Sequence, residues 1–296
     1  MAASTFQFFR HIALELLARG CDERTPEPDL VMADPEQADS FRMAGREDGT
    51  IAPTYLFHTL QLSQMIRPGD LVVDLASGPA NQLAQVARMN PQARFVGVDA
   101  SDSMLELAEE HIKRQGIGNV SFERSYIQSL GTFSDGAVDV VMSTMSLHHL
   151  PDYETLEATF REVARILKPG GALYIADFGR MKRDATRQFF AEQHADRQPP
   201  IFTVDYLNSL RAAFRVDDLK KASLVLGEGV SVKTTALVPF MVLIMRGHGY
   251  TLPESVVDSC GQILRRLPRE QKEDFRDLVR FFKMGGVSAP SLRSRY

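Results

Sequence analysis

The chain has 296 residues, 44% of them hydrophobic, with a formal net charge of −4 and a pI of about 6.0. This length and composition can bury a full core, as one large domain or as a domain with appendages. The charge balance excludes the basic face of a nucleic-acid-binding protein, and the longest apolar run, residues 237–245, is far too short to span a bilayer.

The first 68 residues predict a helical cap ahead of the main domain. Phe6, Phe9, Ile12 and Leu16 recur at helical spacing and are interrupted by charged residues, a pattern unlike that of a signal peptide. Residues 53–66 predict another helix, which the turn "RPGD" ends.

Two cysteines, Cys21 and Cys260, are far apart in the sequence and lack the spacing of a metal or redox motif. This usage fits a reducing compartment, so we expect a cytoplasmic protein and no metal site. A small molecule is the expected partner, without nucleic acid or a membrane span, and a homodimer is left open.

From Asp70 to Phe178, short apolar runs alternate with amphipathic stretches. The runs predict strands buried on both faces, at residues 71–76, 95–99, 120–125, 138–143 and 172–178. The amphipathic stretches predict helices at residues 81–89, 101–116 (with Ser101 as N-cap) and 151–168. Strands that alternate with helices indicate a parallel sheet covered on both faces, whose ligand sites lie beyond the carboxyl ends of the strands.

After Phe178 the pattern changes. Residues 179–200 and 203–222 predict helices, and we expect a helical lid insertion over 180–221. The apolar runs 223–227 and 237–247 predict a strand pair that closes the sheet. The expected fold is therefore a doubly wound, mostly parallel, seven-stranded Rossmann-like α/β sheet with helical additions. Its parts are a cap over 1–68, a core over 69–247 and a helical extension over 248–296.

The stretch "DLASGPAN" after the first strand predicts a turn that holds a nucleotide-like ligand. It lacks the dinucleotide fingerprint G-x-G-x-x-G, since only Gly78 is glycine at the tight turn and Pro79 removes a backbone N–H. S-adenosylmethionine has no phosphate and does not need that amide cradle. Asp74 suits its cationic methionyl end, and Asp99, after the second strand, can accept two hydrogen bonds from a ribose diol.

These motifs resemble the class I S-adenosylmethionine-dependent methyltransferases, particularly small-molecule enzymes of the ubiquinone/menaquinone-methyltransferase-like kind. The resemblance covers Asp70 to Phe178 and rests on "VVDLASGPAN", "FVGVDASDSMLELAEE", "DVVMSTMSLHHLPD" and "REVARILKPGGALYIADF" in this order. The first and third glycines of the family's first motif are Ala76 and Ala80 here. Alanine accepts a turn of negative φ, so we expect cofactor binding with a tighter steric fit.

The resemblance also implies which residues contact the cofactor. They are Asp74, Ala76, Ser77 and Gly78 for the methionyl part, Asp99 and Ala100 for the ribose, Met104, Ser125 and Tyr126 for adenine, and Ser143 and Thr144 on the sulfonium side. Structural alternatives stay open for three of them: Asp99 as a helix cap, Met104 as plain core and Tyr126 as a surface residue.

Methyl transfer from a sulfonium is an in-line displacement, and a general base is needed only where the nucleophile arrives protonated. His148 and His149, after the fourth strand, are the candidate bases, with a structural loop role as the alternative. Tyr55 and His58 of the cap are expected to reach the substrate, and Asp177 to orient it or to satisfy a buried turn. The two cysteines do not supply paired thiols, which argues against arsenite methylation.

Helices placed over the strand ends suit a small, moderately apolar acceptor. The aromatic residues expected on the inner face of the lid, or else in the core, are Phe189, Phe190, Phe202, Tyr206 and Phe214. The sequence does not distinguish whether the methyl group is transferred to an oxygen, a nitrogen or a carbon atom of the acceptor. The alternatives are a non-catalytic cofactor-binding or regulatory protein, a nicotinamide-dependent oxidoreductase, and a methyltransferase fold reused for cyclisation or isomerisation.

Overall fold

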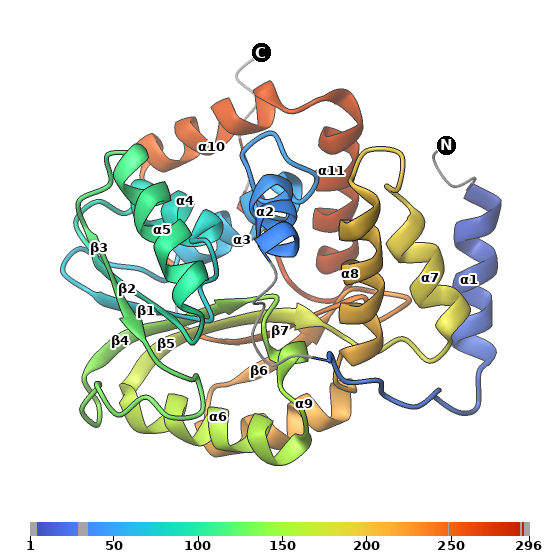
Figure 1. Ribbon diagram of the computed structural model, residues 1–296, viewed down its shortest axis with the longest axis horizontal. Helices are drawn as coiled ribbons and strands as arrows, with labels where there is room; N and C mark the ends of the chain where they lie inside the picture. The colour runs from blue at the N-terminus through green and yellow to red at the C-terminus, as the bar shows by residue number, and fades with distance from the viewer. Residues whose placement is uncertain (1–4, 29–34, 248, 291, 293–296) are drawn as a thin grey trace.

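A computed structural model describes residues 5–28, 35–247, 249–290 and 292. Its centre is a seven-stranded sheet in the order β3-β2-β1-β4-β5-β7-β6 (Figure 1). Strand β7 runs antiparallel to both of its neighbours, β5 and β6, and the remaining strand pairs that the structure describes are parallel. The strands are β1 (Leu71–Leu75), β2 (Arg94–Asp99), β3 (Val120–Arg124), β4 (Val138–Thr144), β5 (Leu167–Phe178), β6 (Ser231–Thr234) and β7 (Met241–Arg246).

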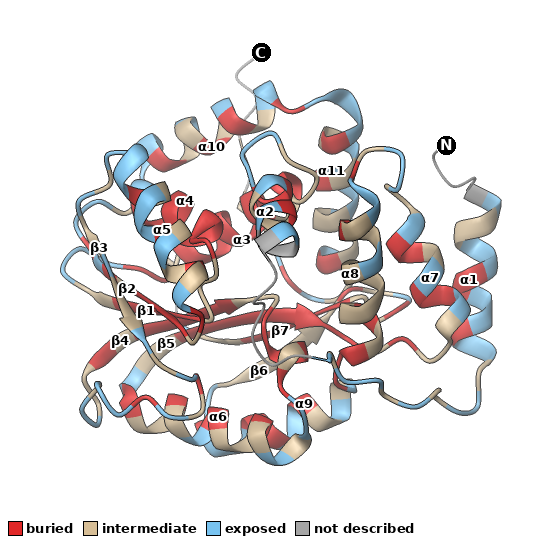
Figure 2. Ribbon diagram, viewed as in Figure 1, coloured by how far each residue is buried: buried red, intermediate tan, exposed pale blue. Residues whose placement is uncertain are grey.

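Helices cover both faces of the sheet, so the predicted doubly wound, mostly parallel Rossmann-like fold is confirmed. One face carries α3 (Ala52–Ser63), α4 (Asn81–Met89), α5 (Asp102–Arg114), α10 (Glu254–Arg266) and α11 (Arg269–Met284). The opposite face carries α6 (Tyr153–Ile166) and α9 (Val216–Ser223), below the sheet in Figure 1. Because successive side chains of a strand point to opposite faces, Val72 packs in the first layer and Val73 in the second. Figure 2 shows the central strands β1, β4 and β7 as mostly buried, whereas the edge strands β3 and β6 are not.

Further helices stand beside the sheet, past the end of β5. They are α1 (Thr5–Leu17), α7 (Asp184–Glu192) and α8 (Pro200–Ala212), and α2 (Pro35–Ala44) packs against α8 on the side towards α3. Ile12, Phe190 and Leu210 from three of these helices pack with Phe178 in a small separate core. Helix α1 is held further by Glu15, whose carboxylate accepts hydrogen bonds from the backbone N–H groups that follow Met181.

Several predicted elements are observed at shifted positions. Helix α6 ends at Ile166, and the Pro-Gly-Gly segment that was expected to follow it belongs to β5. The predicted N-cap of α5 is confirmed, since the Ser101 side chain accepts a hydrogen bond from the Met104 N–H. Among the described helices, none is both long and apolar enough to cross a membrane.

The predicted strand over 223–227 is wrong. This segment forms the end of α9 and a short 3-10 turn over Leu224–Leu226, with Leu224 76% exposed. An apolar run that leaves a leucine in solvent cannot be the buried strand that its composition suggests. The partner of β7 is instead the more polar β6, which lies at the edge of the sheet, where one side of a strand is unpaired.

Candidate active site

The candidate site lies where the loops after β1 and β4 diverge. These two strands are neighbours in the sheet, but β1 leads to α4 on one face and β4 leads towards α6 on the other. The crevice at such a switch point is the usual ligand site of an open α/β sheet. Two cavities open there, one of about 120 Å³ and one of about 660 Å³.

The smaller cavity brings together nearly all of the residues predicted to bind the cofactor. The predicted residues that line it are Asp74, Ala76, Ser77, Gly78, Asp99, Ala100, Met104, Ser125, Tyr126 and Thr144. Ser143 does not line it: its side chain is fully buried, donates to the Leu75 carbonyl over 2.7 Å and is hydrogen-bonded to Ser146. Ser143 therefore holds the ends of β1 and β4 together below the cavity.

Asp99 joins the turn after β1 to the turn after β2. Its carboxylate accepts hydrogen bonds from the backbone N–H of Gly78 over 2.8 Å and of Ser101 over 2.9 Å. Burial raises the pKa of Asp99, and these backbone donors oppose the rise. The structural reading of Asp99 is confirmed, because the carboxylate organises the start of α5. Asp99 also lines the smaller cavity, so its role towards a ribose stays a prediction.

Asp74 is a buried carboxylate with spare hydrogen-bonding capacity. It is 2% exposed, and its Oδ1 has no hydrogen-bond partner among the described residues. Burial, and then the nearby charge of Asp99, hold its pKa well above the usual range. A cationic group beside Asp74, such as the ammonium of a methionyl moiety, would stabilise the ionised carboxylate and so lower its pKa.

The first motif's turn is built with positive φ at the two alanines, so the expected turn of negative φ is wrong. Ala76 has φ +52°, Gly78 +51° and Ala80 +61°. The tight path from the end of β1 into the first turn of α4 demands this left-handed conformation. Glycine adopts it freely, whereas other L-residues pay about 1–2 kcal/mol.

We therefore expect Ala76→Gly to raise the free energy of unfolding by about 0.5–1 kcal/mol. Relief of the strained φ exceeds the entropy that glycine adds to the unfolded chain. Urea unfolding followed by circular dichroism measures the change. Ala80→Gly is the matched comparison and should gain less, because the Ala80 methyl is fully buried in the core. A loss of stability in Ala76→Gly would contradict the strain argument.

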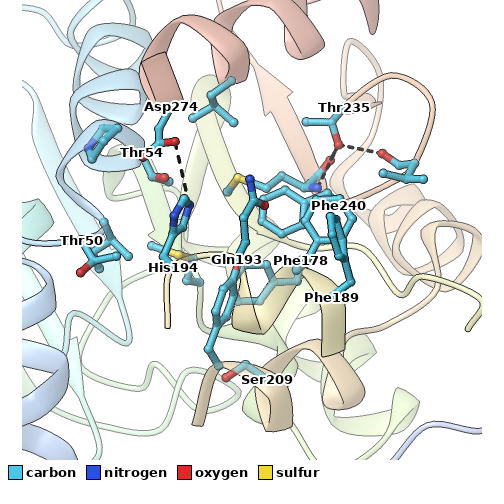
Figure 3. Close-up of a pocket in the computed structure, with 18 of the residues that line it drawn as sticks. Thr50, Thr54, Phe178, Phe189, Gln193, His194, Ser209, Thr235, Phe240 and Asp274 are labelled. Carbon is cyan, nitrogen blue, oxygen red and sulfur yellow. Dashed lines mark hydrogen bonds and ion pairs between the residues drawn. The ribbon is translucent and has the colours of Figure 1, made fainter. Parts of the chain in front are cut away.

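The larger cavity is lined by many aromatic rings together with polar and charged side chains. Figure 3 shows Phe178, Phe189 and Phe240 on one side and His194 with Asp274 on another. Of the aromatic residues predicted for the lid, Phe189, Phe190, Phe202 and Tyr206 line this cavity. Phe214 does not, since it packs in the core beneath α9 and under the Arg24 guanidinium, 4.1 Å from the ring centroid. A volume of about 660 Å³ lies within the ~300–1,000 Å³ usual for small-molecule sites.

The two cavities meet at Phe41, Met145 and His149, which line both. Met145 has φ +55°, so the chain turns sharply directly after β4. Burial lowers the pKa of His149 to about 3, helped by the neighbouring His148, so the His149 ring is neutral at physiological pH. A neutral ring at this junction lies beside any group that passes from one cavity to the other.

His148 lines the larger cavity and is oriented by Asp177. The Asp177 carboxylate lies 2.7 Å from His148 Nδ1 and also accepts the His148 backbone N–H over 3.0 Å. Both side chains are 3% exposed. A carboxylate beside Nδ1 favours the tautomer with its proton on that atom, in which Nε2 is the acceptor. Asp177 thus contacts the histidine and does not line either cavity.

The two cap residues predicted to reach the substrate lie elsewhere. Tyr55 lines the smaller cavity. His58 lines neither cavity: it is fully buried and its Nδ1 lies 2.6 Å from the Tyr174 hydroxyl. Burial lowers the pKa of His58 to about 3, so it is a neutral core residue.

Three contributions to the site were missed in the sequence. Phe41 comes from α2, where a single aromatic residue in a polar helix carries no functional signal. Glu27 lies in a charged, Pro-containing connector and reaches the larger cavity beside His148 and His149. The expectation of no metal site did not consider this group of donors. Phe8 and Phe9 of α1 also line the larger cavity, although the sequence predicted no role in the site for either.

Comparisons with known proteins agree with this geometry. A methyltransferase-domain family profile matches residues 66–208. A ubiquinone/menaquinone biosynthesis C-methyltransferase of Shewanella woodyi is 31% identical over 126 residues, 42% of this chain and 49% of the relative. An arsenite methyltransferase of Aquipseudomonas alcaligenes is 34% identical over 116 residues, 37% of this chain and 33% of the relative. The chain thus spans half or less of the length of these curated relatives.

A solved structure shares the fold. The crystal structure of a SAM-dependent methyltransferase from Aquifex aeolicus aligns with a TM-score of 0.51 and 19% identity, over 72% of this chain and 98% of that one. The segment that matches the family profile contains the first five strands, the turn at Ala76 and the loop of His148 and His149. Residues 66–208 therefore match a methyltransferase-domain family, and the chain shares the fold of a solved SAM-dependent methyltransferase.

Proposed function

We propose that this protein transfers the methyl group of S-adenosylmethionine to a small, largely apolar acceptor. The observation that carries the proposal is the meeting of the two cavities at Phe41, Met145 and His149. A methyl donor in the smaller cavity and an acceptor in the larger one would face each other at this junction. In-line displacement needs this alignment and little else from the protein.

The polar atoms around the smaller cavity fit the cofactor. Buried oxygens of Asp74, Ser77, Asn81 and Gln82 have no hydrogen-bond partners within the described part of the chain. When bound, S-adenosylmethionine supplies an activated methyl group on a cationic sulfur. Asp74 would hold the ammonium of the methionyl part, and Asp99 would accept the ribose hydroxyls.

Admission of the whole cofactor needs a movement of α2. The smaller cavity, at about 120 Å³, lies below the ~300–1,000 Å³ typical of ligand sites. Phe41 of α2 lies over the turn, near Gly78. An outward shift of this ring enlarges the cavity without disturbing the sheet.

His148 is proposed as the group that takes a proton from a protonated acceptor. Its Nε2 acceptor belongs to a ring that lines the larger cavity, and Asp177 stabilises the imidazolium that forms. The aromatic lining selects an apolar or aromatic acceptor. Arsenite is not proposed as the acceptor, because Cys260 is fully buried and burial raises its pKa to about 12.

Calorimetric titration with S-adenosylmethionine tests the proposal, with NAD as the control ligand. We expect micromolar binding of the first and none of the second. Affinity should rise with pH through the raised pKa of Asp74, since the cationic ligand binds the ionised carboxylate and displaces its proton. Titrations in buffers of different ionisation enthalpy measure how many protons are released on binding. Asp74→Asn should abolish this release, because the amide carries no titrating proton. Absence of binding at every pH would refute the proposed function.

A further inference from the structure

Three metal-ligating side chains converge at one end of the larger cavity. Glu27, His148 and His149 each offer a donor atom, and the three atoms lie within 4.8 Å of one another. They come from two distant segments, the connector after α1 and the loop after β4. All three residues line the cavity, so one side of the group faces the space for the acceptor.

Neighbouring side chains hydrogen-bond to two of these donor residues, as the residues around the ligands of a metal site do. Asp177 lies 2.7 Å from His148 Nδ1, which leaves Nε2 as the free donor. A carboxylate on the far nitrogen of a histidine is the commonest support for a metal ligand. On the other side, the Ser209 hydroxyl donates to Glu27 Oε1 over 3.0 Å. Figure 3 shows Ser209 at the edge of this cavity.

Arg24 joins the two segments that carry the donors. Its guanidinium donates to the backbone carbonyls of His148 over 3.0 Å and of Leu150 over 2.5 Å, and to that of Ala212 over 2.7 Å. The connector is therefore attached to the histidine loop three residues before Glu27. This attachment gives the donor group a defined geometry although its members are far apart in the sequence.

We propose that Glu27, His148 and His149 bind one divalent transition-metal ion, of which Zn²⁺ is the representative, with open coordination positions towards the acceptor. Two imidazoles and a carboxylate form a three-ligand set of the kind used where a metal keeps positions free for a substrate. Donors of one zinc ion with bonds of ~2.0–2.2 Å lie about 3.4 Å apart, so donor atoms up to 4.8 Å apart approach one another by up to about 1.4 Å on binding.

The proposal deepens the proposed function and rests on it for the identity of the reaction. The ion would bind an acceptor hydroxyl, a phenol or enol, through its oxygen and lower its pKa, as metals do for bound water. The proton leaves to solvent, so His148 acts as a ligand in the metal-bound protein and as the base only in the metal-free one. The oxygen then forms the new C–O bond while the C–S bond breaks with its electron pair left on sulfur.

The test measures metal binding without cofactor or acceptor. The full chain, without a polyhistidine tag and after treatment with a chelator, is titrated with Zn²⁺ by calorimetry and with Co²⁺ by visible absorption. We expect one ion per chain and d–d bands of a nitrogen- and oxygen-ligated Co²⁺. Mg²⁺, which prefers oxygen ligands, should not compete. Glu27→Gln should weaken Zn²⁺ binding at least 30-fold, and Asp177→Asn about 10–100-fold.

Asp274→Asn is the matched control, since Asp274 is another carboxylate of the same cavity, 4.0 Å from His194. It should bind Zn²⁺ as the unmodified chain does. Failure of the folded chain to bind one ion, or unchanged binding in Glu27→Gln, would overturn the metal site and leave methyl transfer standing. Zinc binding without any binding of S-adenosylmethionine would instead overturn the proposed function and leave the metal site standing.

Discussion

Asp99→Ala should weaken binding of S-adenosylmethionine by about 30- to 1,000-fold. Two ribose hydrogen bonds to a charged acceptor are lost, at a combined cost of about 2–4 kcal/mol. The Gly78 N–H loses its acceptor as well, so the turn that lines the methionyl side is less well held. Calorimetric titration measures the affinity, and thermal unfolding shows whether the variant is folded.

Asp102→Ala is the control for this result. Asp102 lies three residues further along, at the start of α5, where its side chain is 65% exposed and paired with Arg124 over 3.0 Å. An exposed ion pair contributes little, so affinity and stability should stay close to those of the unmodified chain. Affinity that is unchanged in a folded Asp99→Ala chain would contradict the ribose assignment and leave Asp99 as a structural residue.

His148→Ala should lower kcat by about 100- to 10,000-fold while the Kd for S-adenosylmethionine changes less than about twofold. Removal of a positioned proton acceptor, or of a metal ligand, slows the chemical step by this order. The ring does not line the smaller cavity, so the cofactor site should be intact. Steady-state turnover with a phenolic acceptor, together with calorimetry, separates the two effects.

Loss of the His148 ring leaves the Asp177 carboxylate without one partner, although the Phe178 N–H still donates to it over 2.6 Å. We expect a cost of about 1–3 kcal/mol in the free energy of unfolding. His194→Ala is the control, a histidine on another side of the same cavity (Figure 3). Equal losses of turnover and of cofactor affinity in His148→Ala would indicate that the ring supports the loop and takes no part in the reaction.

The fold and the cofactor side of the site could be predicted because they depend on local patterns. A buried parallel strand is a short apolar run, and an acid or turn at its carboxyl end lies at the ligand edge by topology alone. Asp74, Gly78 and Asp99 were predicted in this way to lie together, and all three line the smaller cavity. The strand over 223–227 was mispredicted for the same reason, since composition does not reveal whether a leucine is buried.

The acceptor side could not be read from local patterns. His148 and His149 are adjacent in the chain, but their surroundings differ. Only the folded structure shows that His148 contacts Asp177 and that His149 lies where the two cavities meet. His58 shows the converse: a histidine in the cap resembles a functional residue until packing places it against Tyr174 in the core.

The sequence by itself determined the parallel sheet and the edge of the sheet where a ligand would lie, because the periodicity of a strand and the chemistry of a turn depend on only a few neighbouring residues. Only the tertiary structure decided that the two alanines of the first turn adopt positive φ, because this depends on the path from β1 into α4. It alone also joined Glu27 to the histidine loop. Arg24 makes that connection through hydrogen bonds to backbone carbonyl groups. Every residue has such a carbonyl, so the sequence does not indicate which ones Arg24 contacts.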